Sequence, residues 1–129
     1  MQLFETQITV TKVDLDELKH VNNIRYVDWV NRIAKLHWEK NTSQEMRNNY
    51  FWVLLNHFIE YKRPAFLGDV IKFKTYVTKS EGVTSLRTVE MYNSNTNKLL
   101  AKSETKWCLM DANTNRPTRI NEEIVDLFN

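Results

Sequence analysis

The sequence DLDELKHVNNIRYVDW, residues 14–29, changes from a polar loop to the start of a helix within a few positions. Asp14 and Asp16 are followed by a histidine and two asparagines, and an apolar pattern with helical spacing begins only there. Either asparagine can cap a helix, because its side-chain oxygen accepts a hydrogen bond from a free N–H of the first turn. We therefore expect a loop over residues 14–23 and a helix over residues 22–40.

The predicted helix is apolar around most of its circumference. Two apolar stripes run side by side, and charged residues occupy only the narrow arc that is left. A helix that simply lies on a surface has a narrower apolar face, so this one should be largely wrapped by other structure. The first stripe contains Val21, Ile24, Val27, Val30, Ala34 and His37, and the second contains Tyr26, Trp29, Ile33 and Leu36.

Alternating apolar and polar residues predict the strands. One strand precedes the loop, residues 41–50 are polar, and a series of strands joined mostly by short turns follows. Short turns join antiparallel neighbours, so one helix against a curled antiparallel sheet predicts a single α+β domain over residues 1–129. The expected strands are residues 3–12, 51–62, 71–78, 83–92 and 99–109, residues 111–117 form a polar loop, and a short C-terminal helix over residues 121–128 has Asn121 as its N-cap.

Composition excludes several classes of function. A net charge of +2 is too balanced to indicate a nucleic-acid partner. Cys108 is the only cysteine, which rules out an internal disulfide framework and fits a reducing compartment. The N-terminus does not resemble a signal peptide, and no stretch approaches the ~20 apolar residues of a membrane span. We expect a cytoplasmic protein without membrane insertion.

The start of the predicted helix offers chemistry for a carbonyl group. Free backbone N–H groups and the helix dipole stabilise negative charge there, including the oxyanion formed when a carbonyl is attacked. Asp16 lies four residues before His20, so the loop can fold this carboxylate back to attack the carbonyl or to deprotonate a water. The residues therefore suggest acyl transfer or hydrolysis, although an ordinary capping loop has the same residue types.

The stretch over residues 14–29 also resembles the motif of hotdog-fold acyl thioesterases. This group includes 4-hydroxybenzoyl-CoA thioesterases, bacterial acyl-CoA thioesterases and plant acyl-ACP thioesterases. Residues 59–77, IEYKRPAFLGDVIKFKTYV, and residues 116–124, RPTRINEEI, are similar to later parts of the same family. The resemblance implies a long helix wrapped by an antiparallel sheet, in homodimers or homotetramers with active sites between subunits. The matching motif positions are Asp14, Asp16, His20, Val21, Asn22, Asn23 and Tyr26.

The resemblance also implies roles for individual residues. It places the catalytic carboxylate on Asp16, as general base or nucleophile, and the oxyanion-binding N–H near Asn23. His20 falls where relatives have a histidine that orients the substrate or the loop. Lys19 replaces a glycine common in bacterial relatives, and the asparagine of the plant enzymes falls on Leu18. The expected substrate-binding residues are Asn22 and Tyr26, with Lys62 and Arg63 added because their charge suits the phosphates of coenzyme A. Simple exposure to solvent is the alternative role of these two basic residues, and coenzyme A would be part of the substrate.

The expected function is thus an acyl-CoA or acyl-ACP thioesterase. A non-catalytic acyl-CoA-binding or sensing hotdog protein and an acyl-thioester hydratase or dehydratase are the alternatives. No metal-ligand spacing, glycine-rich phosphate loop or nucleophile elbow is present, so no metal and no separate cofactor are expected.

Four residues outside the motif have structural interpretations. His57 shares strand parity with Val53, Leu55 and Ile59, which predicts a half-buried histidine, and Glu60 faces the other way. His37 and Cys108 are expected in the core.

Arg116 is a third candidate, beside Lys62 and Arg63, for the phosphates of coenzyme A.

Overall fold

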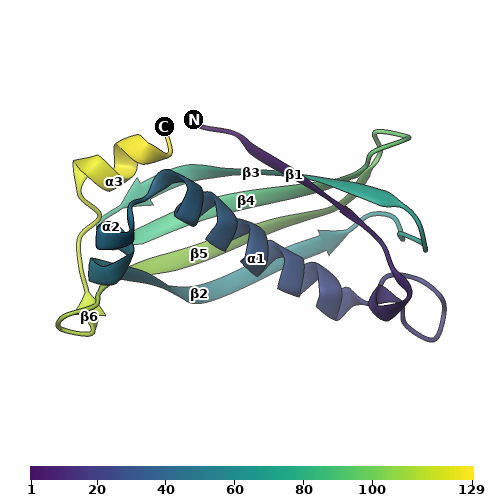
Figure 1. Ribbon diagram of the computed structural model, residues 1–129, viewed down its shortest axis with the longest axis horizontal. Coiled ribbons are helices and arrows are strands. Elements are labelled where there is room, and N and C mark those ends of the chain that lie inside the picture. The colour runs from purple at the N-terminus through teal and green to yellow at the C-terminus, as the bar shows by residue number, and fades with distance from the viewer.

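An antiparallel sheet curls around one long helix in the computed structural model, which describes all 129 residues (Figure 1). This is the predicted α+β hotdog arrangement, and a short C-terminal helix closes one end of it. The helices are η1 (Lys12–Asp14, a 3-10 turn), α1 (Asn23–Asn41), α2 (Gln44–Asn49) and α3 (Glu122–Leu127). The strands are β1 (Phe4–Thr9), β2 (Tyr50–Tyr61), β3 (Val70–Glu81), β4 (Thr84–Asn93), β5 (Leu99–Asp111) and β6 (Arg116–Pro117).

The strand order is β1-β3-β4-β5-β2, with β6 paired to the end of β5. Short turns join β3 to β4 and β4 to β5, as predicted. The connection from β2 to β3 is not a short turn between neighbours, because β2 pairs with β5 and lies at the opposite side of the sheet from β3. Residues 62–69 cross between them, held by hydrogen bonds from Lys62 N to Leu100 O (2.7 Å) and Gly68 N to Val10 O (3.0 Å).

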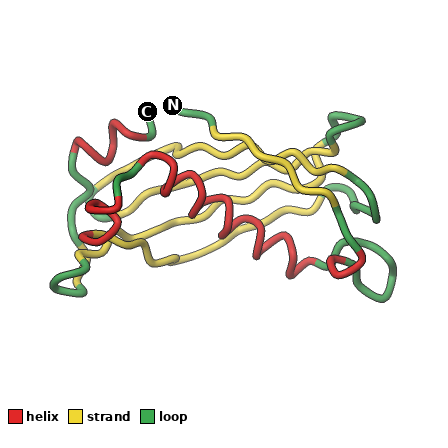
Figure 2. Tube along the Cα trace, viewed as in Figure 1, coloured by secondary structure: helices red, strands yellow, loops and turns green.

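Helix α1 lies across the concave face of the sheet (Figure 2). Trp29 and Ile33 pack into the main core, where the Trp29 ring meets Phe73 edge-on at 5.9 Å. The predicted wrapping is only partial within one chain, because Ile24 is 72% exposed and Leu36 is 49% exposed. None of the helices is both long and apolar enough to cross a membrane.

A short helix, α2, occupies part of residues 41–50, where the sequence pattern indicated only polar residues. Ser43 caps α2 by accepting a 3.1 Å hydrogen bond from Met46 N. Met46 packs against a second core cluster that contains Trp38, so tertiary contact stabilises a helix too short to be stable alone. The two-residue strand β6 lies within the predicted loop, whereas α3 and its Asn121 cap are confirmed.

A β-bulge between Leu54 and Asn56 changes which side chains of β2 face inward. Before the bulge, Val53 and Leu55 are exposed, whereas His57 after it is half-buried and shares a hydrogen bond with Ser103 Oγ (2.9 Å). The predicted common parity of His57 with Val53 and Leu55 is therefore wrong, because one extra residue reverses the alternation. The half-buried environment itself is confirmed, and burial lowers the pKa of His57.

Candidate active site

The loop before α1 folds back on itself and is closed by backbone hydrogen bonds. Leu15 and Val21 form an isolated antiparallel bridge, and Asp16 N donates to His20 O at 2.8 Å. Lys19 has a φ of +63°, in the left-handed region that glycine favours. Lys19 therefore adopts a backbone conformation that costs a residue with a side chain roughly 1–2 kcal/mol.

Asp14 anchors this loop to the rest of the chain. Its side chain is buried, and one oxygen accepts a hydrogen bond from Thr11 N at 2.8 Å. The other oxygen accepts a hydrogen bond from Arg25 Nε at 2.9 Å, which ties the loop to the first turns of α1. Both carboxylate oxygens are occupied, so Asp14 serves the architecture of the loop.

Asp16, two residues later, is used differently. Its Oδ1 accepts hydrogen bonds from Leu18 N (2.9 Å) and His20 N (3.2 Å), which orients the carboxylate by a tight local turn. Oδ2 has no hydrogen-bond partner within the chain, and the side chain lines a cavity. A carboxylate with one fixed and one free oxygen is suited to act as a base or nucleophile.

The first turn of α1 supplies a free donor next to this carboxylate. Asn22 is the N-cap, and its side-chain oxygen accepts a 3.0 Å hydrogen bond from Ile24 N. The backbone N–H of Asn23, the first residue of the helix, has no hydrogen-bond partner. This N–H lies at the positive end of the helix dipole, where an oxyanion is stabilised.

A cavity of about 350 Å³ brings most of the predicted residues together. All of the predicted site residues except Asn22 line it, and the oxygen of Asn22 is already used by the helix cap. The cavity is lined by Asp16, Leu18, His20, Val21, Asn23, Tyr26, Tyr61, Lys62, Arg63 and Pro64.

Two tyrosines, one buried and one exposed, line the cavity. Tyr26 is buried, which raises its pKa to about 12, so its phenol stays protonated at neutral pH. Sequence reasoning missed Tyr61, whose ring meets Tyr26 edge-on at 5.4 Å and whose hydroxyl donates to Asn23 O at 3.3 Å. Its position beside Lys62 in the quoted stretch IEYKRP was the signal that could have found it.

The basic residues differ in how firmly they are held. Arg63 Nη1 donates to Leu99 O at 2.9 Å, whereas Lys62 pairs with exposed Glu60 at 3.2 Å. Both stand at the rim of the cavity. Arg116 does not join them, because β6 pairs with the end of β5 that lies beside Tyr50, at the far end of β2.

His20 packs its ring edge-on against Phe66 at 5.2 Å, which holds it at the cavity wall. The structure contains no group of three His, Cys, Asp or Glu side chains placed to hold a metal ion.

Comparison with known proteins relates both the sequence and the fold to thioesterases. Residues 2–128 match the family described as the acyl-ACP thioesterase N-terminal domain. The long-chain acyl-CoA thioesterase FadM of Escherichia coli (strain K12) is 30% identical over 84 residues. That alignment covers 64% of this chain and 64% of FadM.

Solved structures share the fold at lower sequence identity. The probable thioesterase YbaW from Escherichia coli superposes with a TM-score of 0.85 at 23% identity, covering 95% of this chain and 94% of that one. A 1,4-dihydroxy-2-naphthoyl-CoA thioesterase from Synechocystis gives 0.84 at 14% identity, covering 98% and 95%. SAV2348 from Staphylococcus aureus, solved in complex with CoA, gives 0.86 at 19% identity, covering 98% and 81%.

Proposed function

This chain belongs to the acyl-ACP thioesterase N-terminal domain family, and from that premise we propose that it hydrolyses acyl-CoA thioesters at the cavity beside Asp16, with acyl-ACP as the alternative substrate. The observation that carries this proposal is the pairing of a free Asp16 oxygen with the free Asn23 N–H around one cavity. Hydrolysis of a thioester needs both a base or nucleophile and a donor for the oxyanion. The name of FadM supports a coenzyme A thioester as the substrate.

The proposed reaction begins with the thioester carbonyl oxygen on the Asn23 N–H. In one route Asp16 takes a proton from a water whose oxygen adds to the carbonyl carbon. In the other route the carboxylate itself adds, and water later cleaves the resulting anhydride. Either way the C–S bond breaks, the thiolate takes up a proton and a carboxylic acid is released. Loss of one oxyanion donor typically costs about 2.7–4 kcal/mol in barrier height.

The basic residues at the rim of the cavity would bind the nucleotide end of coenzyme A. Lys62 and Arg63 are exposed there, and arginine and lysine form charge-assisted hydrogen bonds with phosphates. The Arg63 guanidinium is already oriented by Leu99 O, so less side-chain freedom is lost when a phosphate binds.

A second copy of the chain is the proposed partner. Strand β2 is at the sheet edge, and it is long and apolar. Such an edge favours pairing with another strand. Antiparallel pairing of two β2 strands about their centres places the Tyr61 end of one beside the Tyr50 end of the other. The exposed apolar residues of β2 are Phe51, Val53, Leu55, Phe58 and Tyr61.

This dimer would also complete the active site. The cavity beside Asp16 lies at the Tyr61 end of β2, and a larger pocket lies at the Tyr50 end. Pairing therefore sets the cavity of one subunit next to the large pocket of the other. We place the reaction in the cytoplasm, where the buried thiol of Cys108 stays reduced.

The test is thioester hydrolysis across acyl-CoAs from acetyl to palmitoyl, with benzoyl-CoA, followed by release of free thiol. Wild type is compared with Asp16→Asn and with Glu17→Gln, which neutralises the neighbouring exposed carboxylate. We expect Asp16→Asn to lose about 10²-fold or more in kcat and Glu17→Gln to lose little. Full activity in Asp16→Asn would overturn the assignment, and no hydrolysis of any thioester by wild type would favour a carrier-protein substrate or a binding protein.

A further inference from the structure

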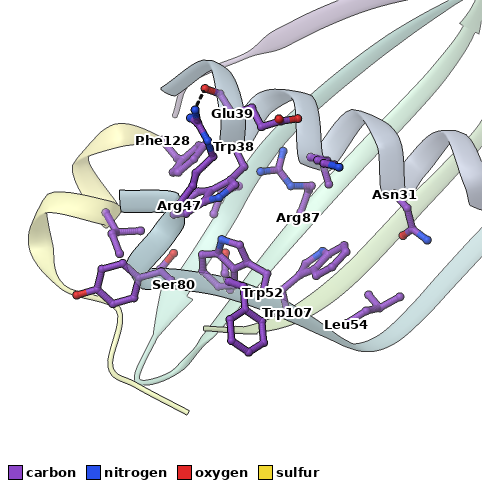
Figure 3. Close-up of a pocket in the computed structure, with 17 residues that line it drawn as sticks. Asn31, Trp38, Glu39, Arg47, Trp52, Leu54, Ser80, Arg87, Trp107 and Phe128 are labelled. Carbon is purple, nitrogen blue, oxygen red and sulfur yellow. Dashed lines mark hydrogen bonds between the residues drawn. The ribbon is translucent and has the colours of Figure 1, made fainter. Parts of the chain in front are cut away.

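A second pocket, of about 550 Å³, lies between α1, α2, α3 and the sheet (Figure 3). It shares no lining residue with the cavity beside Asp16. Its volume falls in the range of ligand sites, about 300–1,000 Å³. Its apolar wall includes Trp38, Trp52, Leu54, Val77, Trp107 and Phe128.

The pocket contains a buried cation. Arg87 on β4 is only 7% exposed, and it lines the pocket on the helix-facing side of the sheet (Figure 3). Its Nη1 donates to His37 Nδ1 at 2.9 Å and to Thr75 Oγ1 at 3.0 Å. Nε and Nη2 have no hydrogen-bond partner, and no carboxylate forms an ion pair with this residue. These two nitrogens form the side of the guanidinium that binds a carboxylate with two parallel hydrogen bonds.

His37 does not balance this charge. Arginine has no acceptor, so His37 Nδ1 must accept, and the ring proton sits on Nε2, which donates to Gln2 Oε1 at 2.6 Å. Burial, together with the charges of Arg87 and Lys40, lowers the pKa of His37 to about 4. The histidine is therefore neutral. Arg87 keeps a positive charge without a counter-ion, and the Phe128 ring, 5.9 Å from its guanidinium, offers only a cation–π contact.

Other groups of the pocket also favour an anion. Lys35 and Arg47 line it with Arg87, against the single carboxylate of Glu39. Asn31 Oδ1 also lines the pocket and is buried without a hydrogen-bond partner. As an acceptor it calls for a hydrogen-bond donor, so it does not add to the preference for an anion. A buried charge without a counter-ion is costly, so a pocket with apolar walls and a guanidinium that forms hydrogen bonds only through Nη1 is better explained as a ligand site than as unfilled core.

We propose that this pocket binds a carboxylate carried on an apolar chain or ring, with the carboxylate on Nε and Nη2 of Arg87 and the apolar part against the tryptophans. Two sources share this chemistry. One is a free carboxylic acid, the product of the proposed hydrolysis. The other is the distal carboxylate of a dicarboxylic acyl thioester whose carbonyl lies at Asp16 of the partner subunit. The second source rests on the proposed function and its dimer, whereas the first requires only the pocket.

Binding is measured directly, by the change in tryptophan fluorescence, because Trp38, Trp52 and Trp107 line the pocket. Octanoate and 1-octanol are titrated into the wild-type protein, because neither contains a thioester that it could hydrolyse. We expect octanoate to bind at least about tenfold more tightly, because the alcohol cannot form the paired charge-assisted hydrogen bonds. Arg87→Met should remove this preference, and Arg32→Met, an exposed arginine on the same helix as Trp38, should keep it.

Equal affinity for octanoate and 1-octanol in a protein that retains Arg87 would overturn the proposal, whether or not Arg87→Met folds. Retained preference in a folded Arg87→Met variant would overturn it as well. Hydrolysis of suberoyl-CoA and octanoyl-CoA then separates the sources. A higher kcat/KM for suberoyl-CoA that Arg87→Met abolishes identifies the acyl group, and no such advantage identifies the free acid. A loss of all hydrolysis would concern the proposed reaction and leave the binding result standing.

Discussion

Arg25 Nε donates a 2.9 Å hydrogen bond to Asp14 Oδ1, across eleven residues of sequence, and this contact fixes the loop before α1. Asp16, two residues further on, forms no hydrogen bond or ion pair with Arg25 and lines the cavity instead. Two aspartates of one motif thus have different tasks, one holding the loop and one available for chemistry.

The two aspartates should differ in their effect on stability. Asp14→Ala should lower the free energy of unfolding by about 2–4 kcal/mol, because it leaves a partly buried guanidinium and the Thr11 N–H without their acceptor. Asp16→Asn should change it by less than about 0.5 kcal/mol, because the amide oxygen still accepts from the same two N–H groups. Urea unfolding followed by circular dichroism measures both. Equal losses in the two variants would contradict this division of tasks.

Position 19 tests the left-handed backbone of the loop. Lys19→Gly should leave stability unchanged or raise it by up to about 1 kcal/mol, because glycine adopts a φ of +63° without steric cost. Lys19→Val should lower it by about 1–2 kcal/mol, because a β-branched side chain is strained there. The two variants are compared by thermal unfolding. If Val were tolerated as well as Gly, the loop conformation would be different in solution.

His37 predicts a dependence of stability on pH. Its pKa is about 4 in the folded protein and 6.5 ordinarily, so the unfolded chain binds the extra proton first as the pH falls. The neutral ring contributes fully to the free energy of unfolding above pH 6.5. This contribution, roughly 3 kcal/mol in total, is lost as the pH falls from 6.5 to 4. Urea unfolding from pH 7.5 to pH 4 measures this loss.

The control for that experiment is His37→Asn, whose side-chain oxygen can accept from Arg87 but does not titrate. Groups elsewhere contribute equally in the two proteins, so the difference between the two pH profiles reports His37 alone. Identical profiles would assign the acid sensitivity to the carboxylates.

The β2 edge predicts the route of self-association. Phe58, on this edge, is 62% exposed, and Phe58→Lys should shift the protein from dimer to monomer without unfolding it. Size-exclusion chromatography with light scattering distinguishes 15.4 kDa from twice that mass. Leu3→Lys, next to β1 at the opposite edge, should remain dimeric. A monomeric Leu3→Lys beside a dimeric Phe58→Lys would reverse the choice of edge.

Several features could be predicted from the sequence because they depend on neighbouring residues. The apolar stripes predicted α1, and alternation predicted the five longer strands. Asparagine before a helical pattern predicted Asn121 as the cap of α3 and left Asn22 and Asn23 as candidates for α1, of which Asn22 is the cap. Residues 14–26 are close together in the sequence. The position of Asp16 and Asn23 in the lining of the same cavity therefore follows from local geometry.

Other features were decided only by the tertiary structure, because they depend on contacts between distant segments. The bulge at Leu54–Asn56 turns His57 inward, and periodicity cannot show an extra residue that is defined by pairing with β5. The pairing of β2 with β5 makes β2 an edge, although sequence order places it next to β3. In the sequence, Arg87 is an ordinary polar residue of a predicted strand. Only in the folded protein do α1 and α3 cover its guanidinium, and they supply no counter-ion for it.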